Sequence, residues 1–210
     1  MKTEFILNAA KAINASILAH ESEIEFLDRE IGDGDHYINI TRGSAVIVSM
    51  HDELAGLAPD VVLNRIGMKL LSTIGGAAGP LFASFFMAMA KAVKEQGGES
   101  LPEIAAAFAA GVAAIQSRGK ANLGEKTMLD TVIPVAQTFT KLAGQGVERT
   151  ALFTALKEAA EKGMLSTKEM LATKGRAAFL GARAIGHIDA GAKSSQVMIC
   201  AVCDLALSEM

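Results

Sequence analysis

The sequence has no tryptophan, a single tyrosine and few aromatic residues of any kind, which make up 5% of its 210 positions. Aromatic and β-branched residues are the ones that fit best on β-sheets, so this shortage disfavours a sheet-rich fold. Alanine, leucine, methionine, lysine and glutamate, which favour helices, dominate the composition instead. The composition therefore predicts an all-α protein.

Cysteine is also scarce, with Cys200 and Cys203 the only two. On a helix they would share a face, as a redox pair or half a metal site requires. No second Cys/His cluster stands at a useful spacing, and apolar neighbours such as Val197 and Val202 indicate buried, reduced thiols. Because the chain also shows no signal peptide, we expect it in the cytoplasm.

Long uncharged runs are limited to residues 70–90, between Lys69 and Lys91. This length is sufficient to span a bilayer. However, its middle reads Gly-Gly-Ala-Ala-Gly-Pro at 75–80, which is turn chemistry. We therefore expect two buried helices joined by a glycine loop, and no membrane span.

The net charge is small, −3 at pH 7, but it is unevenly distributed. Seven acidic residues and one arginine lie between Glu21 and Asp35, so the rest of the chain is slightly basic. Such a surface is a poor partner for nucleic acid and a good one for a cation.

Apolar residues recur at helical spacing along nearly the whole chain, for example at Leu63, Leu70 and Ile74. The predicted helices cover residues 3–20, 37–51, 59–73, 80–95, 101–117, 127–143, 149–171 and 192–208. The run Ala45–Val48 is the one stretch that also fits a strand. Short connections favour one domain over residues 1–210, an eight-helix, up-and-down antiparallel bundle or barrel.

Three carboxylates stand close together in the acidic segment, at Asp28, Asp33 and Asp35. Oxygen ligands crowded near a glycine turn suit a hard cation such as Mg²⁺, which takes few carboxylates and completes its shell with phosphate oxygens. The alternative is a solvated acidic loop that caps the next helix. An EF-hand is excluded, because Ile38 and Ser44 occupy its glycine and glutamate positions.

Three further segments suit phosphate binding. Small residues at 75–80 allow backbone N–H groups to approach a phosphate at a helix start, although a tight interhelical turn explains them equally well. Residues 118–130 nearly imitate a Walker A loop, but Glu125 intrudes before Lys126 and a helix precedes the segment. Arg176 could pair with phosphate, close to a glycine-flanked loop at 186–192.

Together and in this order, these segments resemble the ADP-binding L subunit (DhaL) of bacterial dihydroxyacetone kinases that depend on the phosphotransferase system. The matching stretches are Asp28–His36 with Asn39, Gly75–Phe82, Ser117–Lys120 with Lys126–Met128, Lys174–Arg176 and Gly186–Ala192. They span most of the chain, and their combination is far more specific than any one of them.

The resemblance implies a helical barrel that binds ADP and two Mg²⁺ ions at one end, with the ions held by Asp28, Asp33 and Asp35. The residues implied in nucleotide contact are His36, Tyr37, Ile38, Asn39, Ala77, Ala78, Gly119, Met128, Arg176, Asp189, Ala190 and Gly191. Three of these depart from the family pattern. Tyr37 stands where glycine is usual, Ala78 where serine is common, and Ala190 where the family has proline.

The resemblance also implies partners. A K subunit would hold dihydroxyacetone on its own histidine, and a phosphohistidine-carrying M subunit of the phosphotransferase system would rephosphorylate ADP in place. Since the chain carries only the L part, this donor is favoured over ATP. A transcriptional regulator and a second copy of the chain are further possible partners. The alternatives are an ATP-using subunit for another short ketose, the nucleotide domain of a fatty acid kinase, and a non-catalytic ADP sensor.

Overall fold

The computed structural model describes residues 1–209, which contain ten α-helices, two 3₁₀ segments and no strand. The elements are α1 (Thr3–Ala19), α2 (Glu21–Ile31), α3 (His36–Ser49), α4 (His51–Leu54), α5 (Pro59–Thr73), α6 (Ala78–Gln96), α7 (Leu101–Gly119), α8 (Leu129–Gly144), α9 (Arg149–Ser166), η1 (Thr167–Glu169), η2 (Arg176–Ala184) and α10 (Ala190–Ser208). The predicted all-α class is confirmed.

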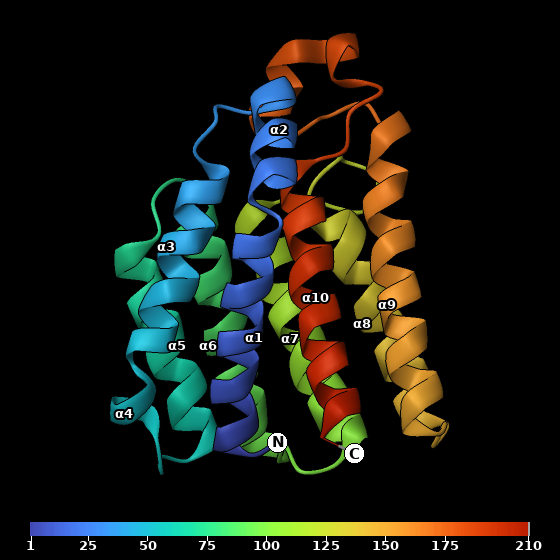
Figure 1. Ribbon diagram of the computed structural model, residues 1–210. Coiled ribbons are helices and arrows are strands. Elements are labelled where there is room, and N and C mark those ends of the chain that lie inside the picture. Colours follow the sequence, from blue (N-terminus) through green and yellow to red (C-terminus); the bar gives the residue numbers. More distant parts are fainter. Residues whose placement is uncertain (210) are drawn as a thin grey trace.

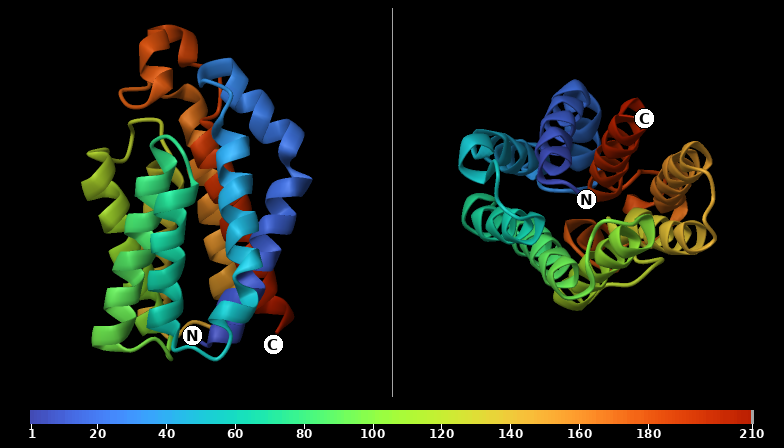
Figure 2. Two further views of the ribbon diagram at one scale, coloured as in Figure 1. Left: turned by 90° about the vertical axis from the view of Figure 1, so that its left-hand side faces the viewer. Right: turned by 90° about the horizontal axis from the view of Figure 1, so that it is seen from below.

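The eight longest helices form a closed ring around a common axis. Each helix of the ring contacts the next one in the order α1, α3, α5, α6, α7, α8, α9, α10. The ring closes because α10 contacts α1. Successive helices of this ring alternate in direction, as Figure 1 shows, and the end-on view of Figure 2 shows them surrounding the centre. Both termini lie at one end of the bundle, and η2 lies at the other.

The predicted helices agree with the observed ones to within a few residues, except that the last part of 149–171 leaves the α-helix at Ser166. The Ala45–Val48 run is helical, so the strand alternative is wrong. The count of eight is too low, because α2 and the single turn of α4 are additional. The uncharged run at 70–90 is divided between α5 and α6, as expected.

Helix α2 was predicted as a loop because acidic residues conceal its apolar face. Ile24, Leu27 and Ile31 recur at spacings of three and four residues and are all buried. The acidic side chains cover the opposite face, where an i,i+4 pair joins Arg29 to Glu25. Asp28 therefore comes from a helix and not from a flexible loop.

Helix α10 is the one described helix that is long and apolar enough to cross a membrane by length and composition. Half of its apolar window is buried inside the bundle, where it packs against α1 and α9. Core helices of soluble proteins meet the same criteria, so this is weak evidence for a span.

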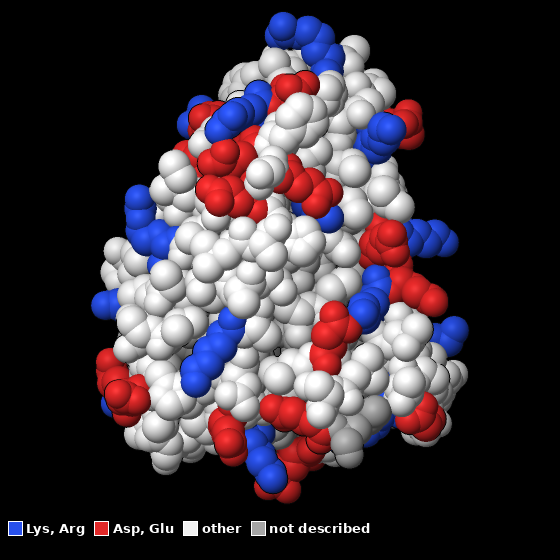
Figure 3. All heavy atoms as spheres, viewed as in Figure 1, with Lys and Arg blue, Asp and Glu red and all other residues white. Residues whose placement is uncertain are grey.

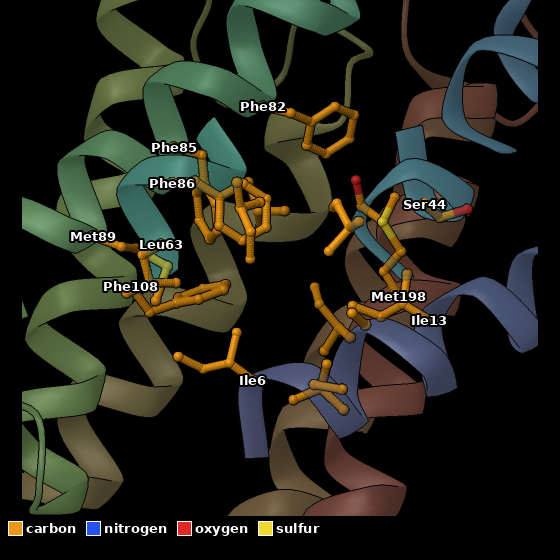
Figure 4. Close-up of a pocket in the computed structure, with 18 of the residues that line it drawn as sticks. Ile6, Ile13, Ser44, Leu63, Phe82, Phe85, Phe86, Met89, Phe108 and Met198 are labelled. Carbon is orange, nitrogen blue, oxygen red and sulfur yellow. The ribbon is translucent and has the colours of Figure 1, made fainter. Parts of the chain in front are cut away.

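The interior of the ring is not completely filled. An apolar cavity of about 270 Å³ lies among the helices, and side chains that line it include Ile6, Phe85, Phe108 and Met198. Figure 4 shows these side chains around the open space. Phe85 stacks edge to face with Phe86 and Phe108, at centroid distances of 5.3 and 5.5 Å.

The buried face of α9 provides a test of this packing. Leu152 is fully buried, whereas Leu165 on the same helix is 49% exposed. We expect Leu152→Ala to lower the free energy of unfolding by about 2–5 kcal/mol, because it removes apolar contacts and leaves a cavity. Leu165→Ala should change it by less than about 0.5 kcal/mol. Urea unfolding measures both, and equal effects would contradict the assigned orientation of α9.

Candidate functional site

A second cavity, of about 510 Å³, opens at the end of the bundle opposite the termini. It is bounded by the α2–α3 turn, the α5–α6 turn, residues 126–128, residues 174–179 and the start of α10. Acidic side chains gather on the surface at this end, over α2 and the start of α3 (Figure 3). Phe82 and Met128 line both this cavity and the central one, so they form part of the partition between them.

Three carboxylates meet at one wall of this cavity. One oxygen from each of Asp28, Asp33 and Asp35 lies within 4.8 Å of the others. Asp28, in the last turn of α2, is buried, and its Oδ2 accepts a hydrogen bond from the backbone N–H of His36 at 3.0 Å. The helix end thus fixes one carboxylate, and the short turn brings the other two to it.

Glycine is required in this turn. A Cβ on Gly32 would lie 1.9 Å from Asp28 Oδ1, so any larger residue would displace the carboxylate. Gly34 has a φ of +78°, a conformation that other residues rarely adopt. The two glycines allow three acidic side chains to converge within eight residues.

Arg176 provides the cation nearest to this cluster among the described residues. Its Nε lies 2.7 Å from Asp33 Oδ2, and both side chains are substantially exposed. One guanidinium cannot neutralise three carboxylates, so the wall keeps an excess of negative charge. A divalent cation would relieve this repulsion, and the donor set is the oxygen-only one that Mg²⁺ prefers.

His36 lies beside the carboxylates and is held by α10. Its Nε2 is 2.9 Å from Oγ of the fully buried Ser194. The Ser194 hydroxyl also lies 3.1 Å from the Gly191 carbonyl, and when it donates there His36 Nε2–H is the donor to Ser194 Oγ. Burial lowers the pKa of His36 below its ordinary value of 6.5, although the neighbouring aspartates oppose this. Burial thus favours the neutral form of this imidazole.

The α5–α6 turn, which adjoins the carboxylates in the same cavity, suits a phosphate. Helix α6 begins at Ala78, and the N–H groups of its first turn have no partners within the helix. Gly76, with a φ of +63°, turns the chain into this helix. A Cβ on Gly75 would lie 3.1 Å from Oδ1 of Asn39, so the turn passes close to this buried amide.

Asp189 caps α10 at the edge of the cavity. Its Oδ2 accepts from the N–H of Ala192 at 2.8 Å, and its own N–H donates to Thr167 Oγ1 at 3.1 Å. Burial raises the pKa of the Asp189 carboxyl to about 6, although the Ala192 hydrogen bond and the charge of Lys126 act in the opposite direction.

Of the fifteen residues predicted for the site, twelve line this cavity: Asp28, Asp33, Asp35, His36, Asn39, Ala77, Ala78, Met128, Arg176, Asp189, Ala190 and Gly191. The other three do not. Tyr37 is buried in the core with Ile24 and Ile40, and the Ile38 side chain is 54% exposed. Gly119 ends α7, where a Cβ would meet Leu81.

Several lining residues were not predicted for the site, including Lys126, Ser194, Phe179 and Phe82. Lys126 belongs to the segment that imitates a Walker A loop, so the neighbouring glycines could have indicated that it lies at the cavity. Ser194 has no such signal, because it resembles any small residue on a buried helix face. Phe179 lies in η2, which the sequence pattern does not predict.

The chain resembles characterised proteins over nearly its whole length. Residues 30–204 match the DAK2 domain. The "PEP-dependent dihydroxyacetone kinase, ADP-binding subunit DhaL" of Escherichia coli K12 is 40% identical over 87% of this chain and 88% of its own length. The corresponding subunit of kinase 2 from Listeria innocua is 37% identical, over 95% and 93%.

More distant relatives are longer. Triokinase/FMN cyclase of Mus musculus is 31% identical over 92% of this chain, which spans 33% of the relative. The crystal structure of dihydroxyacetone kinase from C. freundii with AMP-PNP and Mg²⁺ superimposes with a TM-score of 0.75 at 22% identity. The match covers 97% of this chain and 34% of that one, and it shows a shared fold.

The raised pKa of Asp189 has a measurable consequence. The folded state holds this proton more tightly than the unfolded chain, so the contribution to stability is complete below the ordinary pKa of 3.8 and is lost as pH rises through about 6. Asp189→Asn keeps a capping oxygen but does not titrate. Between about pH 4 and pH 7, the unfolding free energy of the wild type should fall by about 1–3 kcal/mol relative to this variant. Chemical unfolding across this range measures the difference, and parallel pH curves would contradict the prediction.

Proposed function

This chain belongs to the DAK2 domain family, and we propose that it is the nucleotide-binding subunit of a dihydroxyacetone kinase. In this proposal it carries a phosphoryl group on Mg²⁺-bound nucleotide at the loop end of the bundle. It transfers this group to dihydroxyacetone held by a separate K subunit in the cytoplasm. A phosphohistidine-carrying M subunit of the phosphotransferase system then recharges the bound ADP.

The observation that carries this proposal is the pattern of identity among the relatives. Those named ADP-binding subunits of PEP- or PTS-dependent kinases are 37–40% identical to this chain. The triokinase/FMN cyclases are 29–31% identical. The greater likeness to the first group favours ADP as a bound cofactor over free exchange with ATP.

The cavity suits Mg²⁺ and a diphosphate on chemical grounds. Asp28, Asp33 and Asp35 would hold the metal, and we propose two ions from the resemblance to the L subunits. The metal would neutralise phosphate charge during transfer. Asp28 is fixed by the His36 N–H and by the absence of a side chain at Gly32, so this one ligand is positioned before binding.

The remaining residues of the cavity would position the nucleotide. Ala77 and Ala78 line the cavity at the start of α6, where unpaired N–H groups and the helix dipole favour an anion. Arg176 supplies a positive charge beside Asp33. His36 adds a polar contact at the cavity wall. No side chain here need act as a nucleophile, because transfer requires positioning and charge neutralisation.

The three departures from the family pattern differ in their expected effects. The Tyr37 side chain packs in the core, so it does not narrow the cavity. Ala78 and Ala190 both line the cavity. Ala78 offers no hydroxyl to a phosphate, and Ala190 gives α10 a more flexible first turn than proline would. Faster exchange of nucleotide would arise from these two positions.

The carboxylate cluster gives a direct test of the site. We expect Asp33→Ala and Asp35→Ala each to weaken Mg²⁺-dependent binding of ADP by at least roughly tenfold, because each removes a proposed metal ligand. Helical content should be retained, since the change relieves repulsion and opens no core cavity. Glu21→Ala, in the same acidic segment, is the control. Calorimetry measures the affinity, and undiminished binding in both aspartate variants would refute the metal assignment.

The phosphoryl donor gives a second test. The purified protein should retain ADP, because phosphates enclosed by Mg²⁺, backbone N–H groups and Arg176 should be released slowly. With a K subunit and dihydroxyacetone, turnover should require a phosphohistidine donor. Rapid exchange of labelled ATP, with many turnovers on ATP plus the K subunit, would identify the ATP-using alternative.

The same mixture distinguishes the remaining alternatives. The chain alone with ATP should phosphorylate no sugar, because the acceptor site is proposed to lie on the partner. Nucleotide binding without transfer under any combination of donor and acceptor would instead favour an ADP sensor, whose proposed partner is a transcriptional regulator. Sedimentation of the purified chain would detect the proposed homodimer.

A further inference from the structure

Lys126 is the largest residue among the fully buried side chains, with 1% of its surface exposed. It lies between α7 and α8, in the segment that imitates a Walker A loop. Its backbone has a φ of +61°, which is unusual for a residue with a side chain. A buried ammonium and a strained backbone are both costly, so the surrounding structure must offset them.

The partners of this ammonium lie at the two ends of one long loop. Lys126 Nζ donates to the carbonyl of Thr167, where α9 ends, and to the carbonyl of His187, each at 2.5 Å. The residues between these carbonyls, 168–186, form a loop that projects beyond the bundle (Figure 1). Gly186 N–H donates to the Lys168 carbonyl at 2.8 Å, so the loop is closed at its neck.

This loop carries Arg176, the residue that reaches Asp33. The tip itself has little packing. Phe179 is 84% exposed, and the loop meets α2 through a small cluster formed by Ile31, Ala172, Ala177 and Ala184, with Leu180 packed against it, and through His187, 3.6 Å from Glu30. Gly175 and Gly181 have positive φ, a conformation that other residues rarely adopt, on either side of the exposed Phe179. The position of Arg176 therefore depends on how the neck is held.

The residue before Lys126 strengthens the same anchorage. Glu125 Oε1 accepts from Thr173 Oγ1 at 2.8 Å, and its backbone carbonyl accepts from Thr173 N–H at 3.4 Å. Lys174 Nζ lies 4.0 Å from the same carboxylate. Two consecutive residues thus attach the loop at its neck and just before Arg176.

The charge of Lys126 suits this role. Desolvation lowers its pKa, while the charges of Asp189, Glu169 and Asp130 oppose the shift. Hydrogen bonds from a charged donor to two carbonyls are stronger than those from a neutral one. A single ammonium thereby satisfies two carbonyl groups that belong to opposite ends of the loop.

We infer that Lys126 is a positioning residue, which clamps the neck of the 168–186 loop and so holds Arg176 at the acidic wall of the cavity. The inference rests on the proposed function, because ADP is the ligand whose retention Lys126 would control. Lys126 acts through the loop and needs no contact with the nucleotide.

A double-mutant cycle tests this role. The proteins are the wild type, Lys126→Met, Arg176→Ala and the double variant, and the probe is a fluorescent ADP analogue bound with Mg²⁺. Lys126→Met should release the analogue at least about tenfold faster than the wild type. In the Arg176→Ala background the same change should have less than about a twofold effect, because the residue through which it acts is absent. Lys168→Met, an exposed lysine beside Thr167, is the matched control and should leave release unchanged.

Hydrogen exchange of the nucleotide-free proteins supplies the second readout. Lys126→Met should accelerate exchange within residues 168–186 and leave α5 and α6 protected. A purely structural lysine would instead raise exchange across the bundle, and its effect on release would persist undiminished without Arg176. Either result overturns the inference. Should Lys126→Met not fold, Lys126→Gln, which keeps a neutral donor, replaces it in the same cycle.

The outcomes also separate this inference from the proposed function. Failure of the wild type to bind the analogue would refute the proposed function, while exchange in the nucleotide-free proteins would still test the clamp. If the wild type binds the analogue, and Lys126→Met changes neither the release of the analogue nor the hydrogen exchange of the loop, the clamp is refuted and the proposed function stands.

Discussion

Mutual repulsion of three carboxylates is the constraint around which the loop end of this protein is arranged. Asp28, Asp33 and Asp35 have oxygens within 4.8 Å of one another, and one arginine faces them. Such a cluster persists only if the rest of the fold holds it in place. The end of α2, the glycine turn and the start of α3 do so through short-range geometry. The hydrogen bond between His36 and the buried Ser194 then fastens this corner to α10, which also packs against α2.

The ring and the cavity divide the tasks of stability and binding. The long helices bury their apolar faces against one another, whereas the residues that line the open cavity come mostly from turns and helix ends. Turns tolerate the unusual backbone conformations that the site needs, such as those of Gly34, Gly76 and Lys126. Residues from distant parts of the chain can thus meet at one end without disturbing the packing below.

Much of this arrangement could be predicted from the sequence, because helical periodicity and the spacing of Asp28, Asp33 and Asp35 are local signals. Helix α2 was missed since its acidic residues outnumber its apolar ones, although those few fall at helical spacing. Tyr37 illustrates a different limit. It neighbours His36 in sequence, but adjacent residues on a helix point in different directions, so it enters the core. Ser194 and the contacts of Lys126 depend on tertiary packing, which one sequence does not reveal.

The hollow centre of the ring affects how the molecule responds to compression. The helices enclose roughly 270 Å³ that their own side chains do not fill, and unfolding removes this space from the volume of the chain. Hydrostatic pressure therefore favours the unfolded state more strongly than it would for a solid bundle of the same length. The hollow lies directly beneath Phe82 and Met128, which also border the open cavity. A change in the packing of the hollow therefore bears directly on the floor of the site, through these two side chains.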